Sequence, residues 1–279
     1  MMNFRLHDQH VHSSFSSDSK QELKDYIDKA IELGCKYYIT TDHLDFNIND
    51  SHIDWIADYK LQRKCLDLLK ETEYKDKDIE LLLGIEVGFK TKDNIDSNGI
   101  SYQDRIKAIL EENDFDLINL SVHDYKDVDF YFYDNYEKYG LDEIMKIYFN
   151  MEYDAIEQMD FDCLSHIDYA FKTIKMKNPT FSIDVYEDYL IKIFNALVKK
   201  DKALEVNTKV QESINNDNHL RYLLRLYKKS GGKMLTLSSD AHELKRYVSN
   251  FDHYIEIIKE EGFDYLCYFV KRKRYLYYI

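Results

Sequence analysis

The sequence predicts an α/β fold in which a parallel sheet is built from strands that alternate with amphipathic helices. Short runs rich in β-branched and aromatic residues alternate with longer stretches of helical period, in roughly seven repeats. Glycine (8) and proline (1) are scarce, so little interrupts these elements. No Gly-, Ser- or Pro-rich linker divides the chain, and we expect a single domain over residues 1–279.

The expected elements follow one another in a regular order. Strands are expected at 4–12, 36–41, 79–87, 116–122, 161–166, 203–207 and 233–238, with one or two more in the aromatic end, 265–279. Helices are expected at 19–33, 54–74, 102–113, 141–159, 183–200, 219–230 and 250–261, and 124–140 is expected to be a long aromatic loop. Such alternation implies a parallel sheet, open or closed into a barrel, with ligand sites beyond the carboxyl ends of its strands.

The first helix has recognisable signals at both ends. The stretch Ser19-Lys20-Gln21-Glu22 resembles a capping box, in which the serine hydroxyl and the glutamate satisfy free backbone N–H groups. Gly34 follows the last apolar residue and is typical of the position just beyond a helix end. We therefore expect the helix to begin at Ser19.

Charge and hydrophobicity exclude several classes of function. The net charge of −14 disfavours long nucleic acid as a partner, because such proteins usually carry a basic face. A small phosphorylated substrate remains compatible, since bound cations would reverse the local field. No apolar run is long enough to span a membrane, and four scattered cysteines suggest free thiols. We expect a cytoplasmic protein that is a monomer or a homodimer.

Metal-binding residue types occur at or just after most of the predicted strands. The set is His10, His12, His43, Glu86, His123, His166, Asp240 and His242. Strands around a common axis would bring all of these side chains to one mouth. Imidazole nitrogens mixed with carboxylate oxygens suit Zn, Mn or Fe(II) better than Ca or Mg. The remaining histidines, which we interpret as ordinary surface or core-edge residues, are His7, His52, His219 and His253.

Strand alternation sharpens the first of these motifs. Successive side chains on a strand point to opposite faces, so Asp8, His10 and His12 should share one face. The spacing of two residues lets both imidazoles reach one cation. Asp240 and His242 repeat that spacing near the other end of the chain.

These motifs resemble the PHP (polymerase and histidinol phosphatase) superfamily. Its four signature stretches occur in order as Asp8-Gln9-His10-Val11-His12-Ser13, Thr41-Asp42-His43, Ser121-Val122-His123 and Ser239-Asp240-Ala241-His242. Within the superfamily the chain is most similar to the monofunctional histidinol-phosphate phosphatases, in its length and in phrases such as Leu83-Gly84-Ile85-Glu86-Val87. The resemblance implies a distorted (β/α)7 barrel with its metal site at the carboxyl ends of the strands.

The resemblance also implies two to three divalent metal ions (Zn, Mn or Fe) and divides the ligands among them. His10, His12, Glu86 and Asp240 match the first site. Glu86 bridges to a second that takes His123 and His166, and Asp18, His43 and His242 match a third. The implied reaction is hydrolysis of L-histidinol phosphate in histidine biosynthesis by a hydroxide that bridges two metals, with Glu86, Asp18 and His242 as catalytic residues.

The substrate-binding residues depart from the family pattern. An arginine is expected shortly after the His166 strand, but the chain has Tyr169-Ala170-Phe171-Lys172-Thr173 there. Lys172 and Lys209 are therefore the candidates for binding phosphate, as point charges rather than as bidentate guanidinium groups. The proton for the leaving group is assigned to Asp18, His242 or Asp124, and Asp124 is also a candidate substrate-binding residue.

Two alternatives stay open at this point. The same metals could serve a phosphoesterase for nucleotides, short oligonucleotides or phosphotyrosine, because a fold does not fix its substrate. The basic run Lys271-Arg272-Lys273-Arg274 is a small argument for nucleic acid. The second alternative is a non-catalytic, metal-stabilised domain, which the full set of ligands disfavours. Aromatic residues of the 124–140 loop, and Trp55 with Tyr59, could line the pocket.

Overall fold

The strands of the protein are visible in a computed structural model that describes residues 7–48, 53–126, 128–131, 140–177 and 180–279. They are β1 (Tyr37–Thr40), β2 (His43–Ile48), β3 (Ile53–Ile56), β4 (Glu80–Gly88), β5 (Leu117–Ser121), β6 (Asp124–Tyr125), β7 (Val128–Asp129), β8 (Cys163–Leu164), β9 (Ala203–Asn207), β10 (Leu235–Ser238), β11 (Tyr265–Val270) and β12 (Lys273–Tyr278). The main sheet has the order β10-β9-β8-β5-β4-β2-β3, and β1 also pairs with β4. All of its pairs are parallel except β2 with β3, so the predicted parallel sheet is confirmed.

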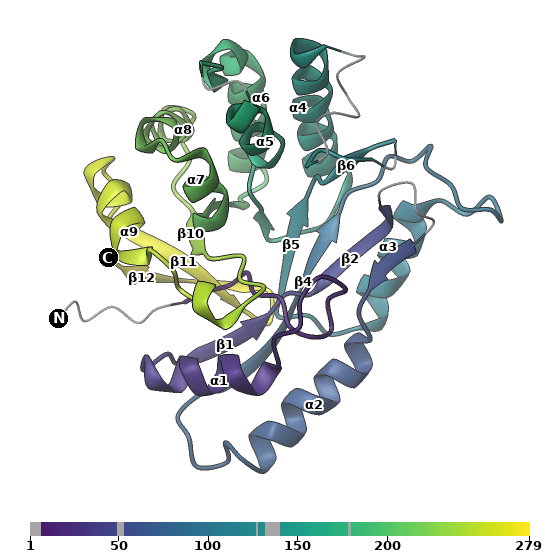
Figure 1. The fold of residues 1–279 in the computed structure, drawn as a ribbon, viewed down its shortest axis with the longest axis vertical. Coiled ribbons are helices and arrows are strands. Elements are labelled where there is room, and N and C mark those ends of the chain that lie inside the picture. Colours follow the sequence, from purple (N-terminus) through teal and green to yellow (C-terminus); the bar gives the residue numbers. More distant parts are fainter. Residues whose placement is uncertain (1–6, 49–52, 127, 132–139, 178–179) are drawn as a thin grey trace.

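The helices lie around the outside of the strands, as Figure 1 shows. They are α1 (Leu23–Glu32), α2 (Tyr59–Glu71), α3 (Tyr102–Glu112), α4 (Leu141–Gln158), α5 (Tyr169–Lys177), α6 (Glu187–Lys199), α7 (Thr208–Ile214), α8 (Asp217–Lys229) and α9 (Phe251–Glu260), with single turns at Ile183–Tyr186 and Leu244–Arg246. The long helices have an apolar side that is buried in the core. In α1 this stripe is Leu23, Tyr26, Ile27 and Ala30. No helix in the described ranges is long and apolar enough to cross a membrane.

The amino-terminal segment links β10, at one end of the sheet, to β1. Val11 forms a parallel bridge with Ala241, which follows β10, and accepts a backbone hydrogen bond of 2.7 Å from Thr41, which follows β1. The predicted strand 4–12 is wrong in the part that the structure describes, because the segment bonds one neighbour on each side and forms a ladder with neither. These bonds connect β10 to β1 across the carboxyl end of the strands, although strand pairing among the described residues does not close the sheet into the barrel that the resemblance implied.

The predicted capping box of the first helix is also wrong. The helix begins at Leu23, and Glu22 occupies its N-cap without a side-chain hydrogen bond. The Ser19 hydroxyl lies 3.0 Å from each of two carbonyl oxygens instead, those of His12 and His242. It therefore ties the first metal-binding motif to the last. Gly34 does end the helix with a positive φ of 73°, as predicted.

Residues 54–74 do not form the single helix that we predicted. Residues 53–56 form β3, which pairs antiparallel with β2 so that Trp55 lies opposite Asp45. The helix begins only at Tyr59, after Asp58 accepts a hydrogen bond of 2.9 Å from the Leu61 N–H. The extra hairpin extends the sheet beyond β2 and places Trp55 beside the His43 ring, at 5.6 Å between centroids.

The basic run near the carboxyl end has structural partners. It forms the turn and second strand of the antiparallel β11–β12 hairpin. Arg272 forms ion pairs with Asp160 and Asp162, and Arg274 binds Asp201 at 2.7 Å. Gln9 fixes β11 by exchanging two hydrogen bonds with the Phe269 backbone, of 2.7 and 2.9 Å. These arginines are therefore bound to acids of the chain itself.

Candidate metal centre

All the predicted metal ligands lie together at the carboxyl ends of the strands. His10 and His12 belong to the bridging segment, His43 begins β2 and Glu86 lies near the end of β4. His123 follows β5, His166 follows β8, and Asp240 and His242 follow β10. Asp18 lies in the loop before α1. Their side chains are buried except for those of Asp18 and His242, which are 31% and 17% exposed. The parallel strands thus bring groups that are up to 232 positions apart in sequence to one mouth.

Glu86 is the centre of this cluster. Its Oε1 atom lies 3.1 Å from His123 Nε2 and 2.8 Å from His166 Nε2. Its Oε2 atom lies 3.3 Å from His10 Nε2 and 3.4 Å from His12 Nε2. One carboxylate therefore faces two separate pairs of imidazoles through its two oxygens.

The charge state of Glu86 fits this position. Burial alone would raise the pKa of the carboxyl group, but the surrounding imidazoles, His10 foremost, lower it well below its usual range. The Ser121 hydroxyl donates a hydrogen bond of 2.6 Å to Oε1. Glu86 is thus held as a carboxylate with both oxygens directed at nitrogen ligands.

Asp240 extends the His10 and His12 group. Its Oδ1 atom lies 3.4 Å from His12 Nε2, and its backbone adopts a positive φ of 49°. Burial opposes ionisation, but Lys209 and His10 keep its pKa well below the ordinary value. Imidazoles and carboxylates therefore alternate around this part of the site.

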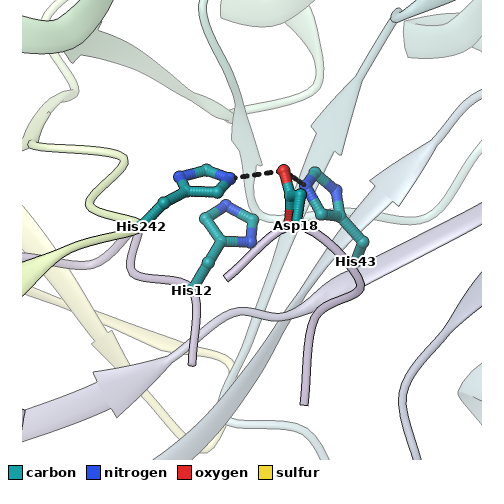
Figure 2. Close-up of side chains that lie close together, drawn as sticks. All are labelled: His12, Asp18, His43 and His242. Carbon is teal, nitrogen blue, oxygen red and sulfur yellow. Dashed lines mark ion pairs between the residues drawn. The ribbon is translucent and has the colours of Figure 1, made fainter. Parts of the chain in front are cut away.

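A further group surrounds Asp18, and Figure 2 shows its four side chains. Asp18 Oδ2 lies 2.8 Å from His242 Nε2 and 3.6 Å from His43 Nε2. The His12 ring packs between the two other imidazole rings, with its centroid 4.1 Å from that of His242 and 4.3 Å from that of His43. Burial and these two neighbours lower the pKa of His12 well below its usual value, so His12 is neutral and has a free lone pair for a cation.

The residues present fit divalent metal ions. His10 Nε2 and His12 Nε2 are buried and have no hydrogen-bond partner, although buried imidazole nitrogens are normally satisfied. Both point at carboxylate oxygens of Glu86 or Asp240 at 3.3–3.4 Å, a spacing that a shared cation would bridge. Several groups of histidine and acidic side chains in this cluster bring three or more ligand atoms within 4.8 Å of one another. Nitrogen and oxygen donors in this proportion favour Zn, Mn or Fe over Ca.

Two acids that the sequence analysis did not include among the site residues support these histidines. Glu205 Oε1 lies 2.8 Å from His10 Nδ1, and its Oε2 accepts a hydrogen bond of 2.9 Å from the His166 N–H. Asp45 lies between His43 and His123. Glu205 could have been found from its place at a strand end, whereas Asp45 lies on β2, a strand that we did not predict.

The candidate phosphate-binding lysines lie beside the cluster. Lys209 Nζ is 3.1 Å from Asp240 Oδ1 and 3.1 Å from His242 Nδ1. Lys172 is buried, with its Nζ atom 4.0 Å from the centre of the Tyr169 ring. Asp124 lies on β6 and forms a buried ion pair with Lys90. Its carboxylate is thus already engaged by a cation of the chain.

Aromatic side chains border the site on two sides. The Tyr169 ring packs 5.1 Å from His166, and its hydroxyl donates to Asp129 at 2.9 Å. In the predicted loop, residues 124–125 and 128–129 form the short β6–β7 hairpin, Phe130 is buried against Tyr148 and Tyr131 is 54% exposed. Four further aromatic residues of this loop lie outside the described residues: Phe132, Tyr133, Tyr136 and Tyr139.

Aromatic residues next to β2 and the remaining histidines are also accounted for. The Tyr59 hydroxyl donates a hydrogen bond of 2.6 Å to the His43 carbonyl. Tyr59 therefore supports the backbone of a predicted ligand. His7 is buried against Tyr268, and His219 forms a buried pair with Asp168 at 2.8 Å. His253 is exposed, and His52 lies outside the described residues.

Comparisons with known proteins agree with this geometry. The PHP domain family model matches residues 8–209. A histidinol-phosphatase of Lactococcus lactis is 27% identical over 267 residues, which cover 94% of this chain and 93% of that protein. A "probable histidinol-phosphatase" of Thermotoga maritima is 26% identical, over 93% of this chain and 94% of its own length.

A solved structure is similar over nearly the whole chain. It is the crystal structure of histidinol phosphate phosphatase from Lactococcus lactis in complex with zinc, L-histidinol and phosphate. The two folds superpose with a TM-score of 0.80 at 25% identity, over 96% of this chain and 98% of the other. The family model, which covers well over half of the chain, and this shared fold lead to one conclusion: the chain belongs to the PHP domain family.

Proposed function

We propose that this protein is a metal-dependent phosphatase that hydrolyses L-histidinol phosphate to L-histidinol and phosphate. The observation that carries the proposal is the position of Glu86, whose two carboxylate oxygens face two different pairs of imidazoles. Support for the substrate comes from the Lactococcus lactis enzyme, which shares the fold over 96% of this chain and binds zinc, L-histidinol and phosphate. A cytoplasmic location belongs to the same proposal.

The proposed ligands form three groups. His10, His12, Glu86 and Asp240 would hold one cation, and Glu86, His123 and His166 a second. Asp18, His43 and His242 would hold a third. Zinc, manganese or iron bound there would lower the pKa of a coordinated water and neutralise charge on the phosphate oxygens. Support for these groups comes from ligand atoms within 4.8 Å of one another in His10, His12 and Glu86, in Glu86, His123 and His166, and in Asp18, His43 and His242. Asp240 joins the first group through its Oδ1 atom, 3.4 Å from His12 Nε2.

The chain's own residues have separate tasks in this reaction. Lys209 and Lys172, which lie near Asp240, would orient the substrate's phosphate group. Their positive charges complement the phosphate oxygens. Burial opposes ionisation of Asp18, but His242 and His43 lower its pKa far below the ordinary value. Asp18 is therefore a carboxylate, which favours a role as ligand over that of proton donor. Asp124 is paired with Lys90, so His242 is the candidate that remains for proton transfer to the leaving alkoxide.

The substrate assignment is tested by a panel of phosphate esters. Metal-loaded protein should hydrolyse histidinol phosphate with a kcat/KM at least about 100-fold above that for a phosphotyrosine peptide or a short oligonucleotide. Released phosphate measures the two monoesters, and released mononucleotides measure the oligonucleotide. The His12→Ala, Glu86→Ala double variant is the matched control and should be inactive on every ester. A preference for either of the other substrates would refute histidinol phosphate while leaving the phosphatase chemistry in place.

Lys172 gives the proposed reaction a pH dependence. Burial lowers the pKa of its ammonium group to about 8, with Lys209 contributing. Lys172 is therefore charged below that pH and loses its charge above it, so KM should rise about tenfold between roughly pH 7 and pH 9. The guanidinium of Lys172→Arg stays charged throughout, and its KM should change less over the same range. Parallel KM profiles for the two proteins would show that Lys172 does not bind the phosphate.

A further inference from the structure

Asp45 is a buried carboxylate placed between two histidines of different ligand groups. It lies on β2, two residues after His43, and is 2% exposed. Its Oδ1 atom is hydrogen-bonded to His123 Nδ1 at 3.0 Å. Its Oδ2 atom lies 3.0 Å from His43 Nδ1. One side chain thus contacts an imidazole of the second proposed group and an imidazole of the third.

Both contacts are made to the Nδ1 atoms of the two rings. The opposite nitrogen of His123, Nε2, lies 3.1 Å from Glu86 Oε1, and that of His43 lies 3.6 Å from Asp18 Oδ2. A neutral imidazole carries its proton on one nitrogen and offers the lone pair of the other. A carboxylate at Nδ1 therefore holds the proton there and leaves Nε2 free to bind a cation.

Glu86 is the other carboxylate near His43 Nδ1, since its Oε2 atom also lies at 3.0 Å. The two oxygens of Glu86 face the Nε2 atoms of four other histidines, and cations between them would occupy these oxygens. Asp45 Oδ2 is buried and has no hydrogen-bond partner. It is therefore the acceptor that remains for the His43 N–H once cations are bound.

The backbone makes room for this carboxylate at a single glycine. A Cβ atom added at Gly88, two residues after Glu86, would lie 1.7 Å from Asp45 Oδ1 and 2.7 Å from its Cγ. Real Cβ atoms do not approach other atoms so closely, so any side chain at this position would displace the carboxylate. Gly88 and Asp45 thus form one structural unit.

We propose that Asp45, seated against Gly88, is a positioning residue that fixes the ring orientation and the tautomer of both His43 and His123. The inference rests on the proposed function only in requiring that the cluster binds divalent cations. It couples two ligand groups through one side chain, so that loss of Asp45 would weaken both together. The identity of the substrate does not enter.

The test compares zinc binding in Asp45→Asn and wild type. An asparagine offers one acceptor oxygen and places N–H donors where the second acceptor was, so it can serve at most one of the two imidazoles. Zinc affinity, measured by competition with a chromophoric chelator, is expected to fall by about 10- to 100-fold. Proton–nitrogen correlation spectra of the zinc-loaded protein should show two histidines in the Nδ1–H tautomer that are lost or exchanging in the variant.

The matched control is Asp162→Asn. Asp162 is a similarly buried carboxylate that binds the Ile118 N–H at 2.9 Å and pairs with Arg272, at the opposite end of the strands. This variant makes the same chemical change without a histidine contact. It should keep the zinc affinity and the histidine tautomers of the wild type.

Gly88→Ala keeps the Asp45 carboxylate but displaces it. It therefore tests the same inference independently if Asp45→Asn fails to fold. It should reproduce the loss of zinc affinity in the wild-type background and add little in an Asp45→Ala background, because the two residues act as one unit. Wild-type affinity and tautomers in both Asp45→Asn and Gly88→Ala, or additive losses in the double variant, would overturn the inference. A wild-type protein that binds zinc but fails on histidinol phosphate would refute the proposed substrate alone.

Discussion

Replacing Glu86 by glutamine is expected to reduce kcat by at least about 10³-fold, the scale on which loss of a central catalytic group acts. The amide cannot offer two anionic oxygens, so the His10 and His12 pair and the His123 and His166 pair would no longer share a bridging carboxylate. Metal content should fall at the same time. Phosphate release under saturating substrate, with elemental analysis of the same samples, measures both effects.

Glu152→Gln is the matched control for this prediction. Glu152 is also fully buried, and burial raises the pKa of its carboxyl group well above the ordinary value, which favours its neutral form. Glutamine is therefore a close match in both shape and charge, and the variant should keep wild-type activity and metal content. If Glu86→Gln behaved like Glu152→Gln, Glu86 would not be the bridging ligand.

Removing the metals is expected to abolish phosphatase activity and to lower Tm by at least about 10 °C. Each site at 100 times its Kd contributes about 2.7 kcal/mol, and one kcal/mol corresponds to about 2–4 °C in a domain of this size. The physical cause is the cluster itself, in which buried carboxylates and several imidazoles face one another at 2.8–3.6 Å. Thermal unfolding before and after dialysis against a chelator measures the loss.

Readdition of zinc or manganese is the control for this experiment. It should restore both Tm and activity, whereas magnesium should restore neither because nitrogen-rich sites bind it poorly. A stripped protein with unchanged Tm and full turnover would contradict a metal-dependent mechanism. A protein that regained Tm but no activity on any ester would instead support a metal-stabilised binding domain.

The alternation of strands and helices was predictable from sequence because parallel strands are short apolar runs between long amphipathic stretches. Two local predictions failed because tertiary contacts outweighed local signals. Ser19 lies within reach of two carbonyls of the metal-binding segments, which prevents its use as a helix cap. The run Ile53-Asp54-Trp55-Ile56 pairs with β2, although its neighbours favour a helix.

The candidate site was predictable to a different degree at each position. Most of its residues could be grouped because they end successive strands, whereas Asp18 lies in a loop and came only from the family resemblance. Asp45 was missed because no strand was expected at residues 43–48, so its alternation with His43 could not be used. The partnership of Glu205 with His10 joins residues 195 positions apart, which no local pattern specifies.

The bonds between the amino-terminal segment and the stretch after β10 have a consequence for how the enzyme matures on the ribosome. His10 and His12 leave the ribosome first, whereas Asp240, His242 and the β11 backbone that receives Gln9 are made last. Synthesis of the intervening chain takes on the order of tens of seconds. During that time His10 and His12 lack the Asp240 carboxylate. The complete cluster is therefore available for cation loading only after residue 242 has been translated.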